Sequence, residues 1–120
     1  MKLLIVDDSS VMRRTIEKHL TNYNLEIVGM AKNGKDAINQ FEMKRPDVVT
    51  LDITMPEMDG LTCLDKMMAI NPEAKVMIIT ALSDKYTGLL ALDKGARGFL
   101  YKPVNQTDLV TAFDKLLKRN

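Results

Sequence analysis

The sequence predicts an α/β domain in which a parallel β-sheet is covered by helices on both faces. Short apolar runs begin at residues 3, 25, 48, 76 and 99, and each interval leaves room for one helix. The runs at 3–6, 48–51 and 76–79 do not alternate with polar residues, which is typical of strands buried on both faces. Strand–helix units in succession favour a parallel sheet with right-handed crossovers.

The strands are expected to coincide with the apolar runs, and the helices to lie between them. The expected strands are residues 3–6, 25–31, 48–51, 76–79 and 99–101. Capping and turn residues mark the helix boundaries. These are Ser9 or Ser10 for the start of the first helix, Asn33-Gly34 and Pro46 for the second, Asn71-Pro72 for the end of the third, and Ser83-Asp84 and Gly95 for the fourth.

Apolar side chains at helical spacing indicate which helix faces are buried. Val11, Ile16, Leu20 and Tyr23 approximate one face of the first helix. The last helix has the clearest stripe, which consists of Leu109, Val110, Phe113, Leu116 and Leu117.

Length and composition restrict the class of protein. A chain of 120 residues fits one domain, and we expect that domain to span residues 1–120. The formal net charge of +1 gives no electrostatic reason to expect direct nucleic-acid binding. Cys63 is the single cysteine, so a disulfide scaffold is excluded and a reducing compartment fits. The apolar run before Asp7 is too short for a secretory or membrane segment. We therefore expect a cytoplasmic protein with no membrane insertion.

Chemically active side chains follow four of the expected strands. Asp7-Asp8 end the first strand, Asp52 the third, Thr80 the fourth and Lys102 the fifth. In open α/β sheets, ligands bind outside the carboxyl ends of the strands, so these side chains should meet at one edge. Three carboxylates and one ammonium remain net negative, and Mg²⁺ prefers such oxygen ligands. The sequence therefore predicts a Mg²⁺ site.

The same cluster suits phosphoryl chemistry. A phosphoryl group bound there would meet a divalent ion, the Lys102 ammonium and the Thr80 hydroxyl, which are the parts that stabilise phosphoryl transfer. A carboxylate beside the ion can act as the nucleophile and form an acyl phosphate.

The strand ends also carry a family resemblance. The series Asp7-Asp8, Asp52, Thr80-Ala81 and Lys102-Pro103, with the loop 52–60 and the segment 95–103, resembles the two-component response-regulator receiver family over essentially the whole chain. The single-domain chemotaxis type is the nearest precedent. The resemblance implies a flavodoxin-like, doubly wound sheet of five strands in the order 2-1-3-4-5, and a cis bond before Pro103.

The resemblance also implies a role for each site residue. Asp52 would take a phosphoryl group from a phosphohistidine of a sensor histidine kinase. Lys102 and Thr80 would contact the phosphoryl oxygens. The Mg²⁺ ligands would be Asp8 directly, Asp7 mainly through water, the Asp52 carboxylate and the Thr54 backbone carbonyl.

In this family the phosphoryl group changes a docking surface. Thr80 would move toward the phosphoryl group, and Phe99 would turn into the space that Thr80 leaves. The face formed by the fourth helix, the fifth strand and the fifth helix would then bind an output protein, either a flagellar switch protein or another effector. The chain would be a switch and not an enzyme, apart from self-phosphorylation and self-dephosphorylation. Leu82 offers no polar group to orient water, so we expect slow self-hydrolysis.

Other functions on related chemistry fit less well. An aspartyl-phosphate phosphatase places its nucleophile and its acid/base on one strand and adds a cap, for which 120 residues leave no room. A flavin carrier needs a hydroxyl- and glycine-rich first loop, and Asp7-Asp8 would repel the flavin phosphate. A receiver module cut from a larger DNA-binding regulator stays open, although a stand-alone domain is preferred.

Several residues near the site have simpler interpretations. Asp59-Gly60 is expected to be a turn and helix start. Arg13 and Arg14 are expected to form a solvated face, with kinase contact as the alternative. Cys63 is expected to be a small, partly buried filler.

Overall fold

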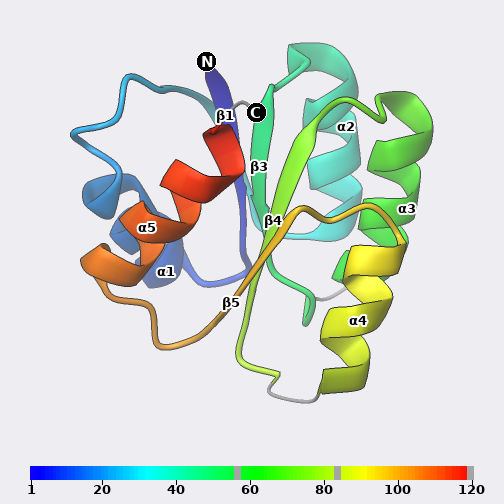
Figure 1. Ribbon diagram of the computed structural model, residues 1–120. Coiled ribbons are helices and arrows are strands. Elements are labelled where there is room, and N and C mark those ends of the chain that lie inside the picture. The colour runs from blue at the N-terminus through cyan, green and yellow to red at the C-terminus, as the bar shows by residue number, and fades with distance from the viewer. Residues whose placement is uncertain (56–57, 83–84, 119–120) are drawn as a thin grey trace.

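The computed structural model describes residues 1–55, 58–82 and 85–118, and it has alternating strands and helices (Figure 1). The expected helix start at Ser83-Asp84 lies outside these residues. The strands are β1 (Lys2–Val6), β2 (Glu26–Ala31), β3 (Val48–Leu51), β4 (Lys75–Thr80) and β5 (Gly98–Tyr101). The helices are α1 (Ser10–His19), α2 (Gly34–Lys44), α3 (Gly60–Ile70), α4 (Lys85–Asp93) and α5 (Gln106–Leu117).

The strands form one parallel sheet in the order β2-β1-β3-β4-β5, which confirms the predicted fold class. β3 lies between β1 and β4, with Val6 opposite Leu51 and Leu51 opposite Ile78. All four residues of β3 are buried, as its continuous apolar run predicts. The aligned register brings the carboxyl ends of β1, β3 and β4 to one edge of the sheet, which is the lower edge in Figure 1.

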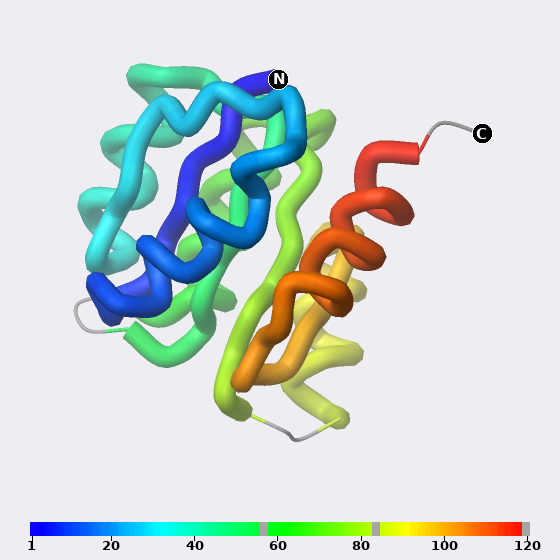
Figure 2. The backbone as a smooth tube through the Cα atoms, turned by 90° about the vertical axis from the view of Figure 1, so that its left-hand side faces the viewer, coloured from blue at the N-terminus to red at the C-terminus, as the bar shows by residue number. Residues whose placement is uncertain are grey.

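Helices cover both faces of the sheet and enclose two hydrophobic cores. α1 and α5 lie on one face, and α2, α3 and α4 lie on the other (Figures 1 and 2). The first core contains Ile16 and Phe113, and the second contains Phe41, Leu64 and Met67. Within the part of the chain that the structure describes, we find no helix long and apolar enough to cross a membrane.

Side-chain caps start three helices where the sequence predicts them: the side chains of Ser9, Asn33 and Asp59 each accept a hydrogen bond from a backbone N–H in the first turn of the helix that follows. Asn105 caps α5 in the same way, which was not predicted. Gly95 follows α4 with a φ of 114°, a conformation that glycine adopts without steric cost. The expected end of the fourth helix near Gly95 is therefore confirmed.

Three burial and boundary expectations are wrong. Val11 is 74% exposed, although we placed it on the inner face of α1. Tyr23 lies beyond α1, because the helix ends at His19 and the Thr21 hydroxyl donates to the carbonyl groups of its last turn. Cys63 is fully buried, since α3 packs this face directly against the sheet.

Thr50 in β3 is a polar side chain inside the core. It is fully buried, and among the described residues its hydroxyl has no hydrogen-bond partner. Such a group keeps its desolvation cost without compensation. We expect Thr50→Val to raise the free energy of unfolding by about 1 kcal/mol in urea denaturation.

The neighbouring Val49 is the matched control, because it is equally buried in the same strand. Val49→Thr buries a new hydroxyl and should lower the free energy of unfolding by about 1–2 kcal/mol. A loss of stability in Thr50→Val would show that the hydroxyl is satisfied in the folded protein.

Candidate functional site

Backbone hydrogen bonds fix the positions of two buried aspartates at the edge of the sheet. The Asp7 N–H donates to the Ala31 carbonyl at 3.0 Å, and the Asp52 N–H donates to the Val6 carbonyl at 3.0 Å. Asp7 and Asp52 are 1% and 4% exposed, and Asp8 is exposed. One carboxylate oxygen from each of Asp7, Asp8 and Asp52 lies within 4.8 Å of the others. The predicted acidic cluster is therefore present.

Gly60 allows α3 to begin directly against the Asp52 backbone. Its N–H donates to the Ile53 carbonyl at 2.7 Å. A Cβ at this position would lie 2.3 Å from the Asp52 carbonyl oxygen and 2.5 Å from the Ile53 Cα. The Asp59 side chain caps the same helix, so the expected role of Asp59-Gly60 as a helix start is confirmed. The pair holds the loop after β3 close to the sheet.

Lys102 is the cation that faces the cluster. Its Nζ lies 2.8 Å from Asp7 Oδ2 and 3.5 Å from Asp52 Oδ2. Burial lowers the pKa of Lys102, but the hydrogen bond and charge of Asp7, together with Asp52, outweigh burial and raise it. Lys102 is therefore an ammonium at neutral pH. The Lys102-Pro103 bond is cis, as the resemblance implies.

The pKa of Asp52 is raised. Burial is the main cause and the negative charge of Asp7 is the second, while Lys102 and the hydrogen bond from the Thr54 N–H oppose them. The Thr54 N–H donates to Asp52 Oδ1 at 3.3 Å. The charged form of Asp52 is thus destabilised in the folded protein, and a further cation near it would favour ionisation.

The cluster fits a hard divalent cation. Asp7 Oδ1 accepts a hydrogen bond from the Ser9 N–H at 2.9 Å. Asp7 Oδ2 is buried, and the Lys102 ammonium lies beside it at 2.8 Å. Three carboxylates that share one neighbouring ammonium form a donor set that suits Mg²⁺.

Thr80 lies beside Lys102 at the end of β4. Its side chain is fully buried, and its carbonyl accepts a hydrogen bond from the Lys102 N–H at 2.8 Å. The Thr80 hydroxyl accepts from the Leu82 N–H at 3.2 Å, which leaves the orientation of its own proton adjustable. Thr80 can therefore donate toward a ligand at the carboxyl ends of the strands.

Phe99 lies outside the acidic cluster, between β5 and α4. Its ring makes an edge contact with Tyr101 at a centroid distance of 5.0 Å. A cavity of about 260 Å³ is lined by Phe99, Tyr101 and four residues of α4: Lys85, Gly88, Leu89 and Leu92. The structure thus places Phe99 next to open space on the α4 side of the sheet.

Arg13 is a site residue that the sequence reasoning missed. Its Nη1 donates to the Asp7 carbonyl oxygen at 2.7 Å, and its side chain is half-buried. The expectation of a solvated face is therefore wrong for Arg13. The available signal was its position in the first turn of the helix that follows Asp7-Asp8, where a long cation can reach back to the strand end.

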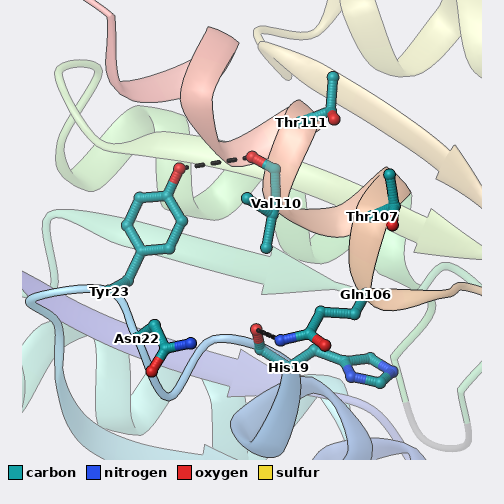
Figure 3. A pocket seen from close by; sticks show the side chains of 7 residues that line it. All are labelled: His19, Asn22, Tyr23, Gln106, Thr107, Val110 and Thr111. Atoms are coloured by element: carbon teal, nitrogen blue, oxygen red, sulfur yellow. Dashed lines mark hydrogen bonds between the residues drawn. The ribbon is translucent and has the colours of Figure 1, made fainter.

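A second pocket lies far from these residues, between the end of α1 and the start of α5 (Figure 3). It encloses about 500 Å³. Part of its lining is already paired: Gln106 donates to the His19 carbonyl, and the Tyr23 hydroxyl donates to the Val110 carbonyl (Figure 3). The acidic cluster, which brings buried carboxylates and an ammonium together, is the better candidate site.

The structure is thus an α/β domain with a doubly wound parallel sheet, in which an acidic cluster and a lysine lie together at the carboxyl ends of the strands, the edge where such sheets bind ligands. The chain belongs to the response regulator receiver domain family, and the sequence profile of that family matches residues 3–114. The predicted family is thereby confirmed.

Similar proteins cover nearly the whole chain. Chemotaxis protein CheY of Listeria monocytogenes is 42% identical over 118 residues, which is 98% of this chain and 99% of that protein. CheY of Thermotoga maritima is 36% identical, with 98% of each chain covered. The solved CheX–CheY–BeF3–Mg complex of Borrelia burgdorferi contains a chain with a TM-score of 0.94 and 32% identity, covering 99% of this chain and 90% of that one.

The raised pKa of Asp52 predicts a pH-dependent gain in stability on its replacement. Between the ordinary pKa of 3.8 and the higher folded-state pKa, the folded chain binds more protons than the unfolded chain, so Asp52 lowers stability as pH rises. In metal-free buffer near pH 7, Asp52→Asn should raise Tm by about 4 °C, and the gain should shrink as pH falls toward 4.

Asp93→Asn removes an exposed carboxylate elsewhere and serves as the control. Lys102 does not contribute to this pH dependence, because its pKa is raised from 10.5 and it stays charged throughout the range. A gain that is independent of pH, or equal in the control, would contradict the assignment to Asp52 ionisation.

Mg²⁺ should stabilise the folded protein. Ions that bind the folded state raise Tm, and a Kd of about 1 mM gives a stabilisation of about 1.4 kcal/mol at about 10 mM Mg²⁺. We expect this shift in wild type and in Asp93→Asn, and a smaller shift in Asp8→Asn. An equal shift in all three proteins, or none in wild type, would count against a site at the cluster.

Proposed function

We propose that this chain is a cytoplasmic signalling switch that accepts a phosphoryl group on Asp52 from a histidine kinase, with Mg²⁺ held at the acidic cluster. The observation that carries the proposal is the buried Asp52 carboxylate, which lies within 4.8 Å of the Asp7 and Asp8 carboxylates and 3.5 Å from Lys102 Nζ at the carboxyl ends of the strands. Asp7, Asp8, Asp52 and the Thr54 carbonyl would hold the ion. Bound there, Mg²⁺ would neutralise charge on the phosphoryl oxygens.

The transfer step needs little from the protein beyond position and charge. An Asp52 carboxylate oxygen attacks phosphorus, the P–N bond of the donor phosphohistidine breaks, and a P–O bond forms. The imidazole nitrogen that leaves takes up a proton. Lys102 would pair with one phosphoryl oxygen and the Thr80 hydroxyl would donate to another. Any attack by water at the same phosphorus would reverse the signal, and the prediction of slow hydrolysis from Leu82 stays open.

The output surface would be the face formed by α4, β5 and α5. Apolar side chains are exposed there, with Tyr86 74%, Leu89 66% and Tyr101 44% exposed. A shift of Thr80 toward the phosphoryl group would let Phe99, which lines the cavity beside α4, turn into the space that Thr80 leaves and so change this face. Such coupling is a two-state element biased by one local charge change. The likeness to the CheY proteins favours a role in chemotaxis, with a flagellar switch protein or another effector as partner.

The chain would therefore act by binding and not as a classical enzyme. A second candidate is the receiver module of a larger regulator. The protein-glutamate methylesterase of Rhodospirillum rubrum favours it, because 85% of this chain is 47% identical to a segment that makes up 28% of that protein. The CheY proteins of Listeria monocytogenes and Thermotoga maritima match over nearly their whole length, and this likeness favours the chemotaxis switch as the first candidate.

A small phosphodonor tests the phosphoacceptor directly. Wild type incubated with phosphoramidate and Mg²⁺ should gain the mass of one phosphoryl group in intact-mass spectrometry. Asp52→Asn should gain none, because an amide cannot form the acyl phosphate. Asp93→Asn should be labelled like wild type, and the label should be lost when Mg²⁺ is chelated. Unchanged labelling of Asp52→Asn would remove Asp52 from the role.

A further inference from the structure

A basic pocket adjoins the acidic cluster on the side of α1 and β2. It encloses about 380 Å³ and is lined by Ser10, Arg13, Arg14, Met30, Lys32 and Asp36. Three of these residues are cations and one is an anion, so the lining carries a formal charge of +2. Asp36 Oδ2 accepts a hydrogen bond from Gln40 at 3.1 Å, so one of its carboxylate oxygens is already engaged. The basic pocket is thus suited to anionic groups.

The basic pocket and the acidic cluster share the backbone of Asp7. The Asp7 carbonyl accepts from Arg13 Nη1 at 2.7 Å, and the Asp7 N–H donates to the carbonyl of Ala31, the residue before Lys32. Arg13 therefore lies one hydrogen bond from the strand end that carries the acidic cluster, and Lys32 follows the residue that pairs with the Asp7 N–H. A molecule that brings a phosphoryl group to Asp52 can contact both.

We propose that the basic pocket binds carboxylate side chains of the protein that donates the phosphoryl group to Asp52. This inference rests on the proposed function and assigns a docking chemistry to the phosphodonor. Arg13, Arg14 and Lys32 lie at the rim of the acidic cluster, where they attract the negatively charged groups of an approaching donor. The phosphoryl group itself goes to Asp52 and Lys102, while the donor's carboxylates go to Arg14 and Lys32.

The exposure of the cations favours a protein ligand over a free anion. Arg14, Lys32 and Ser10 are exposed, and ion pairs at exposed sites are individually weak. A free anion would therefore bind poorly. A protein already positioned at Asp52 presents its carboxylates at high effective concentration, so weak pairs add to binding and to the rate of encounter.

Defined donors test this proposal without an identified kinase. The probes are two synthetic phosphohistidine peptides of equal length, one flanked by glutamates and the other by glutamines. The measured quantity is the initial rate of Asp52 phosphorylation with Mg²⁺ at low ionic strength. Wild type should react about three- to tenfold faster with the acidic peptide, and high salt should remove the preference.

Matched variants locate the effect. Arg14→Gln/Lys32→Gln should react equally with both peptides, and Lys35→Gln, an exposed cation outside the basic pocket, should keep the preference. Phosphoramidate lacks carboxylates, so it should label all these proteins at similar rates. Failure of phosphoramidate to label wild type would instead contradict the proposed function.

Four results would overturn the inference while the proposed function stands. The first two concern rates: wild type reacts equally fast with both peptides, or the double variant keeps the preference for the acidic peptide. The other two are labelling by phosphoramidate but by neither peptide, and tight binding of inorganic phosphate to wild type that the double variant loses. The last result would assign the basic pocket to free anions.

Discussion

The close approach of like charges at the ends of β1 and β3 is the constraint on which the rest of the site depends. Asp7 and Asp52 are both nearly fully buried and carry like charges, so burial and charge repulsion together raise the pKa of Asp52. Backbone hydrogen bonds within the sheet hold them there, and Lys102 compensates part of the charge. Repulsion between the buried carboxylates is therefore built into the fold, and a divalent cation bound beside them would relieve it.

Several neighbouring residues contact the backbone of this charged site and hold it in place. Gly60 lets α3 begin in contact with the Asp52 backbone, and Arg13 reaches back to the Asp7 carbonyl. Thr80 is linked to Lys102 by a backbone hydrogen bond, which connects the end of β4 at the acidic cluster to the end of β5. The acidic cluster and the exposed apolar side chains beside α4 are thus connected through β5.

Much of the fold and most of the site follow from local patterns. The apolar runs, the caps at Ser9 and Asn33 and the residues after each strand predict the sheet, the helix starts and the positions of Asp7, Asp52, Thr80 and Lys102, because strand direction alone brings these ends to one edge. Val11 and Cys63 were misjudged because burial on a helix depends on where it crosses the sheet, and Tyr23 was misjudged because α1 ends at His19. Hydrophobic spacing does not contain that information.

By itself, the sequence determined the class of fold, the carboxylate and lysine chemistry and the family, since all three depend on residue types at the ends of regular elements. Tertiary structure alone decided that Lys102 pairs more closely with Asp7 than with Asp52, that Arg13 belongs to the site, and that a basic pocket adjoins the acidic cluster. These features arise from side chains that are distant along the chain or reach back across a turn. Their contacts exist only once the layers have packed.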